Sequence, residues 1–249
     1  MRRCLMTLSG RLTPDKMRTA TPVDAPLYAN PPIYYKKAEA VGILYETDPD
    51  SALDLLPEGL SLPQPVTAAL LFLKSPFSTL GPYEEAILGI NCLLDDQPRF
   101  YIPHIVVNND IPMAAGREIW GYPKKMADIT YINEVDMIWG KMERPAGHLI
   151  CSAGIRPERP MEMEEAGGGS LALRVIPSPE EGAPPSLAEL IEVPSNMTTH
   201  EFWTGPGWID FNSESPIDPW HKLPVKEIMV ATYRVYDQVL GFGRIVKKY

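Results

Sequence analysis

The sequence predicts an α+β fold made mostly of antiparallel β-structure that curls towards a barrel. Its 27 prolines are spread along the whole chain of 249 residues and divide it into short segments. Seven of these segments are rich in β-branched and aromatic residues and are bounded by Pro, Gly, Asn or Asp, as strands are. Helical signals are few. Many short strands separated by turns are typical of an antiparallel sheet or barrel.

The predicted elements follow one another closely along the chain. The seven predicted strands are Ala68–Leu73, Ala86–Leu94, Phe100–Val107, Ile129–Ile132, Leu149–Ala153, Leu171–Ile176 and Glu227–Tyr233. A helix is expected over Pro49–Leu56, where an aspartate at the N-cap precedes a proline in the first turn. A second is expected over Ile111–Trp120. The stretch from Pro157 to Pro185 is interpreted as two surface loops around one strand, so the chain is expected to form one domain, residues 1–249.

Charge and cysteine content restrict the partners and the compartment. The formal net charge of −9 argues against nucleic acid or an anionic membrane as a partner, because both require a clustered basic face. Cys4, Cys92 and Cys151 are too few and too scattered for a disulfide framework or a zinc site. No apolar run approaches the roughly 18 residues of a membrane span, and no signal peptide is recognisable. We therefore expect a cytoplasmic protein with no metal and no cofactor, since phosphate-loop, flavin and dinucleotide motifs are also lacking.

The segment GREIWGYPKKMADI, residues 116–129, contains the adjacent lysines Lys124 and Lys125. Such a pair is most often solvated and inert. Here apolar residues flank it, and Pro123 biases Tyr122 away from helix, which holds both lysines on a defined turn. Adjacent side chains point in different directions, so one can face inward. Burial disfavours the ammonium form of a lysine, and the neutral amine can attack a carbonyl at neutral pH.

This segment resembles the active-site stretch of acetoacetate decarboxylases, in which the first lysine of the Tyr-Pro-Lys-Lys run forms an iminium with the substrate ketone. Four other segments resemble the family in the same order along the chain. They are LLPEGL at residues 55–60, YEE at 83–85, HEFWTGP at 200–206 and LPVKEI at 223–228. The resemblance implies one α+β domain with a cone-like β-barrel around an internal pocket. It also implies a homo-oligomer and a small keto acid as the substrate.

The resemblance assigns catalytic roles to two residues. Lys124 is expected to form the Schiff base, and Glu85 to move protons as the general acid and base. The side chains assigned to the surroundings of the substrate pocket are Tyr122, Lys125, Arg117 and His104. Among these, Lys125 is expected to turn away and add a nearby positive charge. Arg117 serves either the substrate carboxylate or a surface ion pair, and His104 either faces the pocket or is a core histidine.

Two positions depart from the family pattern. An ungapped count places Ala38 where acetoacetate decarboxylases carry an arginine, and Leu70 where they carry a second acidic residue. The resemblance therefore implies that two polar groups of the decarboxylating pocket are missing here. Lys36 or Lys37 lies close enough in the sequence to replace the missing cation. With Lys124 retained, three functions stay open: decarboxylation of a β-keto acid, aldol condensation and dehydration of pyruvate with an aldehyde, and binding of a small ligand without catalysis. A ligand-binding barrel has no need of a buried amine beside a carboxylate, so retention of Lys124 and Glu85 argues for an enzyme. Because Ala38 and Leu70 replace two charged groups, we expect acetoacetate itself to be a poor substrate.

Overall fold

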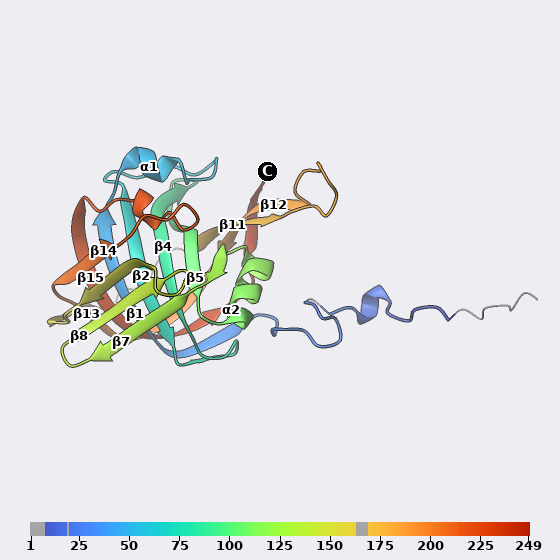
Figure 1. Ribbon diagram of the computed structural model, residues 1–249, viewed down its shortest axis with the longest axis horizontal. Helices are drawn as coiled ribbons and strands as arrows, with labels where there is room; N and C mark the ends of the chain where they lie inside the picture. Colours follow the sequence, from blue (N-terminus) through green and yellow to red (C-terminus); the bar gives the residue numbers. More distant parts are fainter. Residues whose placement is uncertain (1–7, 19, 163–168) are drawn as a thin grey trace, which may run out of the picture.

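The computed structural model describes residues 8–18, 20–162 and 169–249 and contains two β-sheets (Figure 1). The larger sheet consists of β1 (Ile33–Glu46), β2 (Thr67–Ser75), β3 (Phe77–Ser78), β4 (Tyr83–Leu94), β5 (Gln97–Val107), β6 (Lys124–Met126), β10 (Arg159–Pro160), β11 (Ser170–Ile176), β12 (Leu187–Val193), β13 (Ser195–Thr204), β15 (Glu227–Leu240) and β16 (Arg244–Lys248). The smaller sheet consists of β7 (Asp128–Glu134), β8 (Met137–Glu143), β9 (Leu149–Ile155) and β14 (Gly207–Phe211). The short helices are η1 (Pro14–Lys16), α1 (Pro49–Leu53), α2 (Asp110–Ala115), η2 (Gly116–Trp120) and η3 (Trp220–Lys222).

The larger sheet follows the order β10-β13-β15-β1-β2-β4-β5-β11-β12-β16, with β3 paired to β1 and β6 paired to β5. Neighbouring strands are antiparallel except where β5 meets β6 and β11. The predicted α+β class with mostly antiparallel strands is therefore confirmed. Within the described part of the chain, the hydrogen-bonded path begins at β10 and ends at β16, so the predicted barrel is an open, curled sheet and not a closed ring of strands.

The smaller sheet lies across one face of β1, β2 and β4 (Figure 1), and a hydrophobic core fills the space between the two sheets. Phe72 on β2 and Trp220 on η3 are among its fully buried members. The sheets approach closely at Gly140, because a Cβ atom there would lie 2.4 Å from the Phe72 ring. A second core cluster lies on the other face of the larger sheet, where α2 contacts β5 and β6 and η2 contacts β11. Residues of this second cluster, among them Tyr35, Tyr83 and Tyr122, also line the cavity that forms the site.

All seven predicted strands are present, within β2, β4, β5, β7, β9, β11 and β15. The sequence did not predict β1, β3, β6, β8, β10, β12, β13, β14 or β16. Polar residues interrupt the hydrophobic pattern of several of these, as in β13, where Asn196, Thr198 and His200 are all exposed. The first predicted helix ends early, at Leu53, and the second changes after Ala115 into a π-helical turn. Part of the predicted loop region, residues 163–168, lies outside the described residues.

The described helices are all short. None of them is long and apolar enough to cross a membrane.

Candidate active site

The lysine pair follows shortly after the end of a helix and lies in the larger sheet. Helix α2 is capped by Asn109, whose side chain accepts a hydrogen bond from the backbone N–H of Ile111 at 3.0 Å. It continues through η2 and stops at Gly121, which has a φ of +79°. Glycine is required here, because a Cβ atom would also lie 2.3 Å from the Cβ of Arg174. The turn leads directly into strand β6.

Strand β6 separates the two lysines by the ordinary alternation of a β-strand. It pairs in parallel with β5, with Lys124 opposite Ile105, and both side chains line an internal cavity. Lys125 points to the other face, where its Nζ donates to the carbonyl oxygen of Ile217 and to Oδ1 of Asp218 at 2.8 Å. Asp218 is only 1% exposed and also accepts from Nε of Arg144 at 3.0 Å. A buried carboxylate therefore holds Lys125 away from the cavity.

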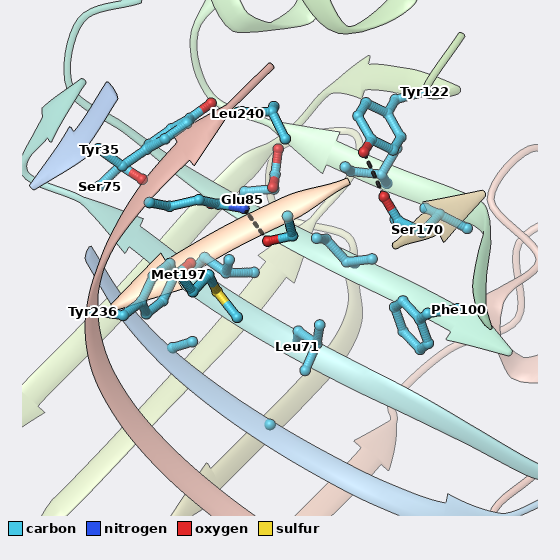
Figure 2. A pocket seen from close by; sticks show the side chains of 18 of the residues that line it. Tyr35, Leu71, Ser75, Glu85, Phe100, Tyr122, Ser170, Met197, Tyr236 and Leu240 are labelled. Carbon is cyan, nitrogen blue, oxygen red and sulfur yellow. Dashed lines mark hydrogen bonds between the residues drawn. The ribbon is translucent and has the colours of Figure 1, made fainter. Parts of the chain in front are cut away.

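Lys124 and Glu85 form a buried ion pair in the cavity wall. Nζ of Lys124 lies 2.6 Å from Oε2 of Glu85, and the two side chains are 7% and 10% exposed. Figure 2 marks this hydrogen bond with a dashed line at the Glu85 carboxylate. The same Nζ lies 5.4 Å from the ring centroid of Tyr83 and 6.0 Å from that of Tyr122. Gly116 makes room for the lysine stem, because a Cβ there would lie 2.6 Å from Cδ of Lys124.

The cavity has a volume of about 370 Å³, enough for a small organic ligand. Its walls come from β1, β2, β4, β5, β6, β11, β13 and β15, and Figure 2 shows side chains from several of these strands converging on one space. Apolar groups such as Leu71, Ile87 and Leu240 make up much of the surface. An ion pair in such surroundings is poorly solvated, so the charges of substrate and protein act strongly on one another.

Buried phenols surround the ion pair. The hydroxyl groups of Tyr35 and Tyr83 lie 3.1 Å apart, and that of Tyr122 lies 2.6 Å from Oγ of Ser170. Burial raises the pKa of each of these tyrosines above its ordinary value, and the negative charge of Glu85 adds to the effect. Each therefore remains a neutral phenol at neutral pH, able to donate a hydrogen bond to a substrate oxygen.

Of the residues predicted to surround the pocket, Tyr122 lines the cavity, whereas Lys125, Arg117 and His104 do not. Arg117 is exposed, and its Nη1 donates to the carbonyl oxygen of Lys124 at 3.0 Å, so it supports the backbone of β6.

His104 stacks on Trp220 on the opposite face of β5. Burial, with the nearby charge of Lys125, lowers the pKa of His104 to about 4. Strand alternation explains its place, since its neighbour Ile105 faces the cavity.

The two positions that depart from the family pattern lie in different parts of the molecule. Ala38 is fully buried opposite Tyr236 in register, in the cluster beside the cavity. Leu70 is buried in the core between the sheets and does not line the cavity, so the expectation that it removes a group from the pocket is corrected. Lys36 is exposed and pairs with Asp237 at 2.7 Å. Lys37, also exposed, lies in a bulge of β1, and neither lysine replaces the missing cation in the cavity.

The sequence prediction missed Arg234, a cationic residue that lines the cavity from strand β15. The predicted strand stopped at Tyr233, whereas β15 continues to Leu240. Extending the alternation by one residue beyond the predicted end would have placed the arginine on the face opposite Tyr233. Among the described residues, no group of three or more His, Cys, Asp or Glu side chains is placed to hold a metal ion.

The sequence and the fold both match a known family. A family model described as acetoacetate decarboxylase (ADC) matches residues 20–249. The chain belongs to the acetoacetate decarboxylase family. Acetoacetate decarboxylase 2 of Mesorhizobium japonicum is 30% identical over 238 residues, which cover 92% of this chain and 89% of the relative. The match confirms the family that the sequence motifs indicated.

Two solved structures share the fold. One, described as structural studies of acetoacetate decarboxylase, superposes with a TM-score of 0.88 at 24% identity and covers 96% of this chain and 99% of its own. The other is the enduracididine biosynthesis enzyme MppR complexed with pyruvate, with a TM-score of 0.80 at 20% identity, covering 92% of this chain and 97% of its own. At these identities the likeness shows the fold alone.

Proposed function

We propose that this family member is a carbon–carbon lyase that decarboxylates a keto acid through a Schiff base on Lys124. The observation that carries the proposal is the buried ion pair of Lys124 and Glu85, at 2.6 Å, in the wall of a largely apolar cavity. A buried amine beside a proton acceptor is the arrangement that nucleophilic catalysis by lysine requires. An ion pair of this kind is costly to bury, so a purely structural role is a weak explanation for it.

The first half of the reaction forms the iminium. Glu85 accepts a proton from the Lys124 ammonium across their hydrogen bond, which leaves a neutral amine beside a neutral carboxylic acid. The amine adds to the substrate ketone. Glu85 then returns its proton so that the ketone oxygen leaves as water and a positively charged iminium remains. Tyr83 and Tyr122, both close to the lysine and both protonated, donate hydrogen bonds to the departing oxygen.

The second half breaks the carbon–carbon bond. The bond to the carboxylate cleaves, its electron pair moves into the iminium, and CO2 leaves behind a neutral enamine. A proton taken up from solvent reaches the enamine carbon through Glu85, and water hydrolyses the new iminium to release the ketone and the Lys124 ammonium. The apolar wall of the cavity assists the middle step, because loss of CO2 disperses charge that poor solvation disfavours.

Condensation of pyruvate with an aldehyde is the second candidate function. Proton loss from a pyruvate iminium gives the same kind of enamine, so Lys124 and Glu85 serve both reactions. One MppR structure that shares the fold is complexed with pyruvate, and another is complexed with the condensation product of pyruvate and imidazole 4-carboxaldehyde. The two reactions differ in their products, CO2 in one and a longer keto acid in the other.

The test compares the two adjacent lysines as matched variants. Purified protein is assayed for CO2 release from a series of β-keto acids and, separately, for condensation of pyruvate with aldehydes. We expect Lys124→Ala to abolish turnover and Lys125→Ala to retain most of it, because Lys125 binds Asp218 outside the cavity. Turnover that survives Lys124→Ala would refute the Schiff-base mechanism, and condensation without decarboxylation would select the second function.

A further inference from the structure

Strand β15 supplies a row of polar side chains to one wall of the cavity. Thr232, Arg234 and Gln238 alternate along the strand on the face that lines the cavity. Two of the three are already engaged. Oγ1 of Thr232 donates to the carbonyl oxygen of Gly42 at 3.3 Å, and Nε2 of Gln238 donates to Oγ of Ser195 at 2.8 Å. Tyr236, between Arg234 and Gln238, adds a phenol to this row. The guanidinium of Arg234 is the charged group in the row, and no hydrogen bond to another described residue occupies its N–H donors.

Arg234 is half-buried and lacks a carboxylate partner among the described residues. Its guanidinium carbon lies 4.3 Å from the ring centroid of Phe202, a cation–π contact. Burial lowers the pKa of Arg234, although a guanidinium stays charged at any physiological pH. The ring contact uses the face of the planar group and leaves the N–H groups at its edge available, and these match a carboxylate in geometry.

Arg234 also determines the charge of the cavity. Among the described residues that line it, the charged side chains are Glu85, Lys124 and Arg234. Glu85 and Lys124 neutralise one another, so the lining carries one net positive charge, located at Arg234. Low-dielectric walls concentrate the field of such a charge and favour an anionic group.

The register of the sheet places Arg234 away from the reacting amine. Arg234 pairs with Ala40 on β1, Ala40 with Leu73 on β2, and Leu73 with Glu85 on β4. All four side chains line the cavity. Along the sheet the arginine and the glutamate are therefore three strand spacings apart, about 14 Å, with only an alanine and a leucine between them. A ligand that reaches both ends needs a polar group at each end and an apolar chain in the middle.

The chemistry of decarboxylation decides which carboxylate Arg234 can bind. A cation bound to the departing carboxylate stabilises the ground state more than the transition state, in which the charge is leaving, and so slows the reaction. A carboxylate that stays in the product carries no such penalty. We propose that Arg234 binds a second, non-reacting carboxylate, and that the substrate is a β-keto dicarboxylic acid with an apolar chain between its ketone and its distal carboxylate. This inference rests on the proposed Schiff-base function.

Acetoacetate does not meet this description. Its single carboxylate is attached to the carbon next to the ketone, so it cannot react at Lys124 and reach Arg234 at the same time. Acetoacetate is therefore expected to be a poor substrate for two reasons: it cannot use Arg234, and the protein has Ala38 where the family pattern has an arginine.

The test measures kcat/KM for β-keto dicarboxylic acids of increasing chain length, each beside its monoester at the distal carboxylate. The monoester keeps the chain and removes the charge. At the best length we expect the wild-type protein to prefer the free acid by about 30-fold, the lower end of what truncating a buried charge pair costs. Arg234→Gln should abolish this preference. Arg156→Gln, which alters an exposed arginine paired with Asp136, is the matched control and should keep it.

The preference is a ratio of two kcat/KM values measured on the same protein, so a loss of folded protein in a variant lowers both values equally and does not change the ratio. Arg234→Lys, which keeps the charge without the planar fork, should restore part of the preference. A wild-type protein that shows no preference at any length, or an Arg234→Gln variant that keeps it, would overturn the inference. The Schiff-base proposal is judged separately by borohydride trapping at Lys124 in the same samples. Trapping without an effect of Arg234→Gln rejects the arginine assignment alone, whereas absent trapping with an intact preference rejects the Schiff base alone.

Discussion

Glu85 and Lys124 should behave as one energetic unit in unfolding experiments. Their side chains are 10% and 7% exposed and are joined at 2.6 Å. Removing one partner of a buried pair leaves an uncompensated charge and costs about 3–5 kcal/mol. Because this pair borders a cavity that water can enter, we take the lower end, about 3 kcal/mol, for Glu85→Gln or Lys124→Met alone. In a protein of this size that corresponds to a fall in Tm of roughly 6–12 °C.

The double variant separates pairing from simple truncation. With both charges removed, Glu85→Gln/Lys124→Met leaves no buried charge unpaired and should be close to the wild-type protein in stability, within about 1 kcal/mol. Urea unfolding of all four proteins gives the coupling energy. Single-variant losses that simply add in the double variant would show that the two charges are not coupled, and the argument from a buried ion pair would fail.

Three further predictions concern the surroundings of the pair. Gly116→Ala should lower kcat at least tenfold, because the new Cβ would lie 2.6 Å from Cδ of Lys124 and displace the lysine, and reaction rates are sensitive to the position of the reacting group. Gly241→Ala is the control and should leave kcat unchanged, because a Cβ there meets nothing within 4 Å. Asp218→Asn should lower the free energy of unfolding by about 1–2 kcal/mol, less than for a fully buried ion pair, because its cationic partners are partly exposed. Peptide mapping of this variant after borohydride reduction should still find the adduct on Lys124. Folding lowers the pKa of His104 from 6.5 to about 4, so between these pH values the unfolded chain binds more protons than the folded one. The contribution of His104 to the free energy of unfolding is therefore fully present above pH about 6.5 and is lost as the pH falls towards 4. His104→Phe should flatten this part of the stability profile; an unchanged slope in urea unfolding would contradict the assignment.

The lysine motif shows how far local sequence reasoning reaches. Pro123 and the apolar flanks predicted that the helix ends and that both lysines lie on a defined turn. The helix does end, at Gly121, but the lysines lie in the short strand β6. The sequence did not reveal that Gly121 is the residue that makes the turn possible, because the atom that excludes a larger side chain belongs to Arg174, far along the chain. Similarly, the partner that holds Lys125 outward is Asp218, which no spacing rule connects to the motif.

The chemical composition of the cavity was harder to predict than the fold. Strand identity depends on local pattern, and every predicted strand is present. Cavity composition depends on which face of each strand is turned inward, and one residue of error in register reverses that answer. Leu70 was assigned to the pocket and lies in the core between the sheets, whereas its neighbour Leu71 lines the cavity. Arg234 was missed because its strand was predicted to end at Tyr233, one residue before the arginine, whereas β15 continues to Leu240.

The central claim is that Lys124 is the nucleophile, and reductive trapping tests it most directly. The protein is incubated with a keto acid that it turns over, reduced with borohydride, digested and analysed by mass spectrometry. We predict a single adduct on Lys124, which faces the cavity beside Glu85, and none on Lys125, whose amine is bound to Asp218. An adduct on Lys125, or turnover of a keto acid with no lysine adduct at all, would contradict the account.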